Sequence, residues 1–197
     1  MTKPPYDTSI FFLSILSFFT KREISKETVT ELKNRLKFRH YKKGEIIYHP
    51  KDSQEVLAFI RSGMVRGYTI LDGYELTNWI SIENEIFAPS SFLSEIMFHE
   101  SINALEDVSI EYLTKKDYLD LLNYEDFLSL SQKLFSDYYV FANRRAMIAR
   151  IPNSSDRLSF FKNNFNKEII KRCPNKYLSS FLGMRPETLS RLISKKT

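Results

Sequence analysis

The order of helical and strand-like segments constrains this chain's fold most strongly. A helical segment at residues 8–36 precedes short apolar segments separated by turn residues, and helical spacing returns after Thr114. The short apolar segments predict strands near 45–48, 56–60, 64–70, 75–80, 86–87, 101–105 and 108–113. Asp72-Gly73, between two of them, is a strong hairpin signal. The sequence therefore predicts an α+β fold, in which an antiparallel barrel or roll has flanking helices.

The second helical part contains a short helix expected at 117–123 and a long one expected over 124–150. The long helix is apolar on two sides, so it needs two partners. One is the roll and the other is a second copy of the same helix, which predicts a homodimer; the alternative is a helix buried within one chain. The stripe assigned to the dimer interface comprises Phe127, Leu130, Leu134, Tyr138, Phe141, Arg145 and Ile148.

Ile151-Pro152-Asn153 ends the long helix, because proline lacks the amide donor and disfavours helix at the residue before it. This break and the start of the long helix give three predicted parts. They are an N-terminal unit of helices and roll at 1–123, called the sensor unit below, a dimerisation helix at 124–150 and a C-terminal domain at 151–197.

Charge is distributed unevenly between these parts. The chain carries a net +5, yet residues 152–197 carry +7 and residues 1–151 carry −2. A basic C-terminal quarter on a near-neutral body is typical of a module that binds a polyanion. A solvated basic face would give the same composition, so charge alone leaves both interpretations open.

Residues 175–193 indicate which class of polyanion this module would bind. They read as two helices joined at Gly183, where the turn needs a residue that tolerates positive φ. Ser179 is small where the helices approach, and Pro186 suits the first position of the second helix. The apolar contact between the helices is assigned to Leu178, Leu182, Leu189, Leu192 and Ile193. With the local basic charge, this pattern favours a DNA-binding helix-turn-helix over an ordinary helical hairpin.

The segment Gly183-x-x-Pro186-Glu187-Thr188-Leu189-Ser190-Arg191-Leu192 resembles the recognition helix of the Crp/Fnr superfamily of bacterial transcription regulators. Segments 42–45, 59–68 and 103–107 resemble strands and turns of the family's β-roll, closest to a branch common in Bacteroidetes. The resemblance implies a cyclic-nucleotide-binding-like jelly roll, a long dimerisation helix and a C-terminal all-α helix-turn-helix domain. Only four residues follow Ile193, so a full wing is not expected.

Glu187, Ser190 and Arg191 share one face of the second helix and are the candidates for base readout. Arg191 can bind a guanine edge and Glu187 can accept from a cytosine amine. The sequence Glu-x-x-Ser-Arg is similar to that of Fnr-type recognition helices, and this resemblance implies a palindromic site with TTGAT-like arms. The candidates for phosphate contact are Lys176, Ser180, Thr188, Arg185, Lys195 and Lys196. Arg185 is a weak N-cap, where Ser or Thr is usual.

The sensor unit lacks the residues that this superfamily uses for cyclic nucleotides. The family's Gly-Glu-Leu and Arg-Ser signatures correspond here to segments 87–92 and 101–104, and no Lys or Arg lies between Arg66 and Lys115. A phosphate there would be poorly compensated, so cAMP regulation is not expected. The effector is unknown; an uncharged or apolar small molecule, or none, fits the composition.

No cofactor or metal is expected. Cys173 is the single cysteine, which excludes an internal disulfide or an iron–sulfur cluster, and the three histidines lack paired spacing. No catalytic motif is present, so an enzyme is improbable. The apolar run at residues 10–19 is about half the length that crosses a bilayer, which predicts a cytoplasmic protein without a membrane segment.

The leading prediction is a homodimeric regulator that binds double-stranded DNA, with RNA polymerase as a further partner to test. The alternative is a sensing or protein-interaction module that has lost DNA binding.

Overall fold

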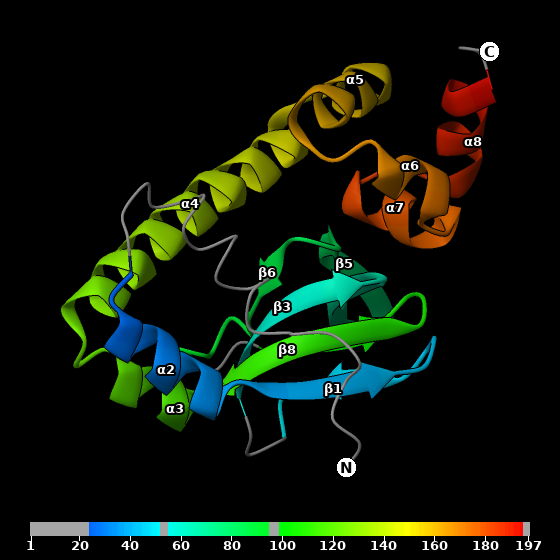
Figure 1. The fold of residues 1–197 in the computed structure, drawn as a ribbon. Coiled ribbons are helices and arrows are strands. Elements are labelled where there is room, and N and C mark those ends of the chain that lie inside the picture. The colour runs from blue at the N-terminus through cyan, green and yellow to red at the C-terminus, as the bar shows by residue number, and fades with distance from the viewer. Residues whose placement is uncertain (1–23, 52–54, 95–98, 195–197) are drawn as a thin grey trace.

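The computed structural model describes residues 24–51, 55–94 and 99–194. Its strands form two four-stranded antiparallel sheets, ordered β1-β8-β3-β6 and β2-β7-β4-β5 (Figure 1). The strand bounds are β1 Lys37–Tyr41, β2 Ile46–Tyr48, β3 Val56–Ser62, β4 Met64–Leu71, β5 Tyr74–Ile82, β6 Ile86–Phe87, β7 Glu100–Ala104 and β8 Val108–Thr114. The predicted antiparallel roll is confirmed.

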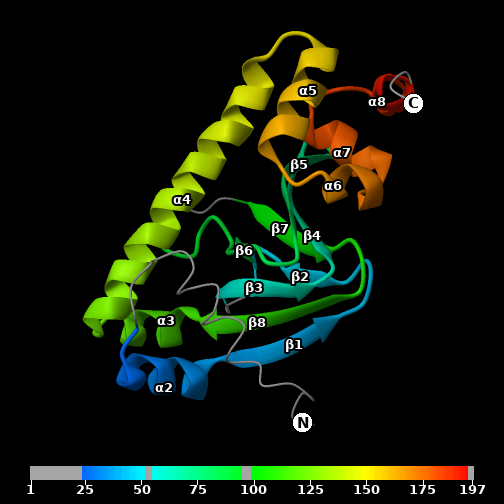
Figure 2. The same cartoon turned by 45° about the horizontal axis from the view of Figure 1, so that its top comes forward.

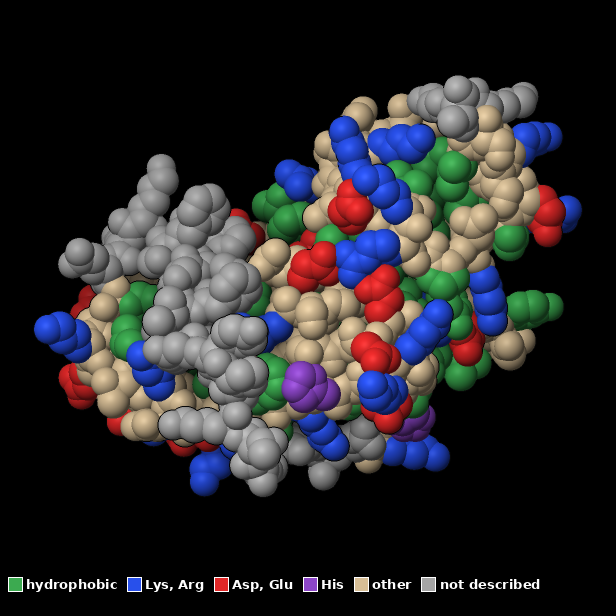
Figure 3. Space-filling view, turned by 45° about the vertical axis from the view of Figure 1, so that its right-hand side comes forward, with side chains coloured by type: hydrophobic (Ala, Val, Ile, Leu, Met, Phe, Trp, Pro, Cys, Tyr) green, Lys and Arg blue, Asp and Glu red, His purple; other side chains and the backbone are tan. Residues whose placement is uncertain are grey.

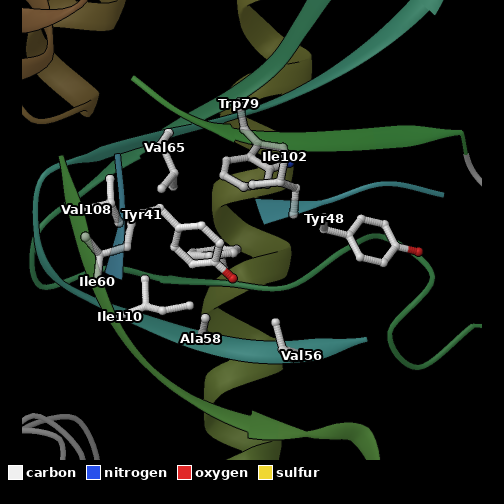
Figure 4. Packing of buried hydrophobic residues seen from close by; sticks show 12 residues of the cluster. Tyr41, Tyr48, Val56, Ala58, Ile60, Val65, Trp79, Ile102, Val108 and Ile110 are labelled. Carbon is white, nitrogen blue, oxygen red and sulfur yellow. The ribbon is translucent and has the colours of Figure 1, made fainter. Parts of the chain in front are cut away.

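The interior of the roll is filled by side chains from both sheets (Figure 4). The Trp79 ring packs across Gly67, where an added Cβ would lie 2.2 Å from the Trp79 ring. The hairpin between β4 and β5 turns at Asp72 and Gly73, which both have positive φ, as the sequence predicts. The interior cluster comprises Tyr41, Tyr48, Val56, Ala58, Ile60, Val65, Trp79, Phe87, Ile102, Ala104, Val108 and Ile110.

The helices lie at the two ends of the roll and along its side (Figure 2). Their bounds are α2 Lys26–Arg35, α3 Lys115–Leu121, α4 Glu125–Arg150, α5 Ser154–Asn164, α6 Glu168–Arg172, α7 Asn175–Phe181 and α8 Pro186–Ser194. Ser25 caps α2 through a hydrogen bond from Thr28 N, and Asn153 caps α5 through one from Ser155 N. Helix α4 ends at Arg150, immediately before the predicted break. The three-part domain division itself stays a prediction.

Two elements escaped the sequence analysis. Strand β1 is not among the strands that the sequence predicts, because its His and Arg side chains are exposed and only Tyr41 is buried. Helix α6 has five residues, too few for a helical period to be seen. The part of the predicted N-terminal helix before Ile24 lies outside the described residues.

The C-terminal helices pack on the outer face of sheet β2-β7-β4-β5. Met64, Ile80 and Ile82 of the roll join one apolar cluster with Leu178 and Leu189 of the C-terminal helices. At the opposite end, α2 and α3 close the roll with the start of α4. In the described part of the chain, no helix is both long and apolar enough to cross a membrane.

Candidate nucleic-acid interface

Helices α7 and α8 form the predicted two-helix unit around Gly183. Gly183 has φ 59°, in the left-handed region that favours glycine. Its amide donates to Ser180 O at 3.1 Å, and the Met184 amide donates to Ser179 O at 3.0 Å, which closes the end of α7. Ser179 is buried, as expected where the helices meet. The five apolar residues predicted to join the helices all belong to one cluster.

Arg157 of α5 holds the turn from outside. Its Nη1 donates to Leu182 O at 2.8 Å and to Gly183 O at 2.6 Å, so a cation satisfies carbonyls at the end of α7. The sequence analysis did not identify this residue. Its only signal was charge, which cannot distinguish a structural arginine from one that contacts DNA.

The three residues assigned to base readout are all exposed on α8. Glu187 lies in the first turn, and Ser190 and Arg191 follow on the same face. Ser190 Oγ accepts a hydrogen bond of 3.0 Å from Asn175 Nδ2, which links the exposed side of α8 to the start of α7. Both ribbon views place α8 on the outer side of the C-terminal helices, away from the roll (Figures 1 and 2).

The residues assigned to phosphate contact have different environments. Lys176 and Arg185 are exposed and Thr188 is half-buried. Ser180 instead faces the roll, where its Oγ accepts from Thr77 N at 3.0 Å and lies 3.4 Å from Glu75 O. Lys195 and Lys196 lie outside the described residues. Lys and Arg side chains are spread over the C-terminal helices in the upper part of Figure 3.

Two arginines join the C-terminal helices to the roll. Arg172 of α6 donates to Glu106 through Nε at 3.0 Å and to Glu83 through Nη1 at 2.6 Å. Arg66 of β4 is buried, and its guanidinium lies 3.8 Å from the ring centre of Tyr177 on α7. From the sequence, both arginines contributed only to the net charge and had no assigned contact.

Arg66 also donates from Nε to Asn103 Oδ1 at 3.1 Å and from Nη2 to Glu75 Oε2 at 2.8 Å. Its Nη1 is buried with no hydrogen-bond partner among the described residues. This guanidinium therefore joins α7 directly to the sheet β2-β7-β4-β5.

The predicted dimer stripe faces its own protomer. Phe127 and Leu130 are buried against the roll and its end helices, and Ile148 is buried among the C-terminal helices. Leu134, Tyr138, Phe141 and Arg145 line a cavity between α4 and these two parts. Phe127, Leu130 and Ile148 of the predicted interface are therefore covered within one chain, because periodicity locates an apolar stripe without showing which neighbour covers it. Contact of Leu134, Tyr138, Phe141 and Arg145 with a second copy stays a prediction.

A buried carboxylate of β7, Glu100, is bound by the loop that contains Ser90. Glu100 Oε2 accepts from the amide and the hydroxyl of Ser90, at 3.1 and 2.8 Å. Its Oε1 accepts from Asn78 Nδ2 and Trp79 Nε1, at 3.0 and 2.9 Å. Glu100 is 1% exposed, so these donors compensate a buried anion supplied by the chain itself.

Comparisons with known proteins show which proteins this chain is similar to. Residues 38–125 match the model of the cyclic nucleotide-binding domain. FixK2 from Bradyrhizobium japonicum is similar at TM-score 0.67 and 19% identity, over 81% of this chain and 83% of that one. A CooA mutant from Carboxydothermus hydrogenoformans is similar at TM-score 0.65 and 18% identity, over 92% and 83%. A structure described as a regulator of the crp/fnr family from Eubacterium rectale is similar at TM-score 0.66 and 18% identity, over 87% and 83%.

The chain has the Crp/Fnr fold. The resemblance to this superfamily is thereby confirmed at the level of the fold, with the roll and the long helix where it implied them. No curated protein matches the sequence.

Proposed function

We propose that this protein is a transcription regulator of the Crp/Fnr type that binds a palindromic DNA site as a homodimer. The observation that carries the proposal is the face of α8, where Glu187, Ser190 and Arg191 are exposed together on a two-helix unit whose turn is hydrogen-bonded to Arg157. Side chains on one face in the first turns of such a helix are those that reach base edges in the major groove.

The partner surface proposed for the homodimer is the outer face of α4, opposite the stripe that packs inward. It carries large apolar side chains that are 40–69% exposed in the single chain. A soluble helix rarely leaves so many apolar side chains in water without a partner. These residues are Leu128, Tyr139, Val140 and Met147.

Regulation by cAMP is not part of this proposal. Two features argue against a cyclic nucleotide inside the roll: side chains fill the interior, and Glu100 uses the donors of the Ser90 loop. A second anion beside a buried carboxylate would be strongly disfavoured.

Selection of bound sequences from a random DNA pool tests the function, with ligand-free protein at about 150 mM salt to suppress nonspecific binding. We expect a palindrome with TTGAT-like arms. Arg191→Ala should reduce the free energy of binding by about 1–3 kcal/mol on that site and by little on random DNA. Lys176→Ala should instead weaken binding to both DNAs alike. Equal losses for Arg191→Ala on both DNAs would remove it from base readout.

A module that has lost DNA binding is the second candidate, and the engagement of Ser180 by β5 favours it. Under that function no sequence would be enriched, and charge reversal at Arg191 would change no DNA affinity. Cytoplasmic location and contact with RNA polymerase belong to the regulator proposal, since such a protein acts where DNA is transcribed.

A further inference from the structure

Asn175, the first residue of α7, reaches across to the exposed face of α8 that carries the base-readout candidates. Its Nδ2 donates a hydrogen bond of 3.0 Å to Ser190 Oγ. In the described part of the chain, no hydrogen bond or ion pair engages the side chain of Glu187 or Arg191. Glu187 and Arg191 are therefore fully available to DNA, whereas Ser190 is partly committed before DNA binds.

The Asn175 carboxamide does not perform the usual task of asparagine at a helix start, which is to cap the amides of the first turn. Pro174 is the N-cap of α7, and Asn175 already lies inside the helix. The two helices are held together by fully buried apolar side chains, among them Leu178, Leu182 and Leu189. A neutral hydrogen bond between exposed side chains adds little to such packing, so stability alone does not explain the contact.

The contact determines what the Ser190 hydroxyl can offer to DNA. A serine hydroxyl has one proton and two lone pairs. In a helix the proton commonly goes to the carbonyl four residues earlier, as Ser194 Oγ donates to Ser190 O at 2.9 Å. Among the described residues, the Ser190 hydroxyl donates to none. Because Asn175 Nδ2 already donates to one of its lone pairs, the Ser190 proton is kept for an acceptor outside the chain.

We propose that Asn175 is a positioning residue that makes Ser190 a hydrogen-bond donor to DNA, an inference that rests on the proposed function. In the major groove, thymine O4 and guanine O6 and N7 only accept hydrogen bonds, whereas cytosine N4 only donates. A cytosine facing Ser190 would leave the hydroxyl proton without an acceptor in a desolvated interface, which is costly. Thymine or guanine is therefore favoured over cytosine at the base that Ser190 contacts.

The test begins by locating this base, as the position of the selected DNA site whose preference is relaxed by Ser190→Ala. Four duplexes that differ only at that position are then titrated with the full chain, by fluorescence anisotropy at about 150 mM salt. The wild type should bind the thymine or the guanine duplex about 10-fold more tightly than the cytosine duplex. Asn175→Ala should reduce this ratio to about 3-fold or less, because the hydroxyl is then free to rotate.

Asn175→Asp tests the direction of the hydrogen bond. A carboxylate only accepts, so the Ser190 proton turns toward it and the lone pairs face the base. The ratio should then reverse in favour of cytosine. Because each ratio is taken within one variant, the added negative charge, which weakens all four duplexes alike, cancels. In the double variant Asn175→Ala with Ser190→Ala, the ratio should equal that of Ser190→Ala alone.

Asn163→Ala is the matched control, because Asn163 is an exposed asparagine of α5 and no hydrogen bond joins it to Ser190 in the described part of the chain. It should keep the wild-type ratio. A purely structural role of Asn175 would weaken all four duplexes and leave their ratio unchanged, and that result would overturn the inference. Preference of the wild type for cytosine, or an unchanged ratio in Asn175→Asp, would overturn it as well.

The inference and the regulator function fail in different ways. All of the contrary ratios are measured on a selected site, so they overturn the role of Asn175 and leave sequence-specific DNA binding intact. Failure of the wild type to enrich any sequence overturns the regulator function, and the role of Asn175 in base preference falls with it.

Discussion

Loss of Arg172 should loosen the C-terminal helices from the roll. Its guanidinium donates three charge-assisted hydrogen bonds, two to Glu106 and one to Glu83. The Arg172 side chain is 27% exposed, and the carboxylates 33% and 31%, so the cluster is partly screened by solvent. Arg172→Gln would leave two carboxylates facing each other without a cation.

The size of the effect follows from this geometry. A hydrogen bond to a charged group contributes about 1.5–3 kcal/mol when buried, and exposed ion pairs contribute about 0.2–1 kcal/mol. Three such bonds at intermediate burial give a loss of about 2–3 kcal/mol for Arg172→Gln. For a chain of this length, that lowers the unfolding midpoint by about 4–12 °C.

The assay is thermal unfolding at pH 7 by calorimetry, with Lys171→Gln as the control because Lys171 pairs only locally with Glu168 in α6. A double-mutant cycle with Glu106→Gln should give a coupling free energy of about 1–2 kcal/mol. Coupling below about 0.5 kcal/mol, or equal midpoints for Arg172→Gln and Lys171→Gln, would refute the reasoning.

This contribution should also depend on pH. The hydrogen bond from Arg172 lowers the pKa of Glu83 below its ordinary value of 4.5. A lowered carboxyl pKa stabilises the fold fully above the ordinary pKa, and the contribution is lost as pH falls through the lowered one. The difference between wild type and Arg172→Gln should therefore be largest near neutral pH and shrink in acid.

Three further predictions concern the roll and the thiol. Gly67→Ala should destabilise the fold by about 3 kcal/mol or more in urea unfolding, because its methyl would overlap the ring of Trp79. Burial raises the pKa of Glu111 to about 7 despite Arg61 at 2.8 Å, so the wild type should lose stability from about pH 4.5 to 7. As pH rises over that range, the free energy of unfolding of Glu111→Gln should increase by about 1–3 kcal/mol relative to that of the wild type. Burial raises the pKa of Cys173 to about 12, so iodoacetamide at pH 8 should label it only after unfolding.

Each of these has a clear contrary outcome. A wild-type urea midpoint for Gly67→Ala would mean that the ring of Trp79 does not lie against that backbone. Parallel pH profiles for wild type and Glu111→Gln would mean that Arg61 compensates the carboxylate fully. Labelling of Cys173 in the native protein at the rate of a free thiol would place it outside the apolar cluster.

Local patterns predicted most elements of this fold because their causes lie within a few residues. Asp72-Gly73 tolerates the positive φ that a tight hairpin needs, and Gly183 does the same for the turn between two helices. Pro152 ends a helix whatever surrounds it. By contrast, β1 has mostly exposed side chains, and its pairing with β8 depends on residues about seventy positions away.

The candidate interface was predicted in part for the same reason. Helical spacing alone brings Glu187, Ser190 and Arg191 to one face. It cannot tell that β5 engages Ser180 or that Arg157 holds the turn, because both contacts join segments distant in the chain.

The sequence by itself therefore determined the order of the elements, the basic C-terminal unit and the face of α8 that Glu187, Ser190 and Arg191 share. Tertiary structure alone decided which elements of the chain cover the inner side of α4, since periodicity finds an apolar stripe but packing chooses its neighbour. That choice turned the stripe inward against the roll and the C-terminal helices, where it lines a cavity, and left Tyr139 and Met147 exposed on the opposite face.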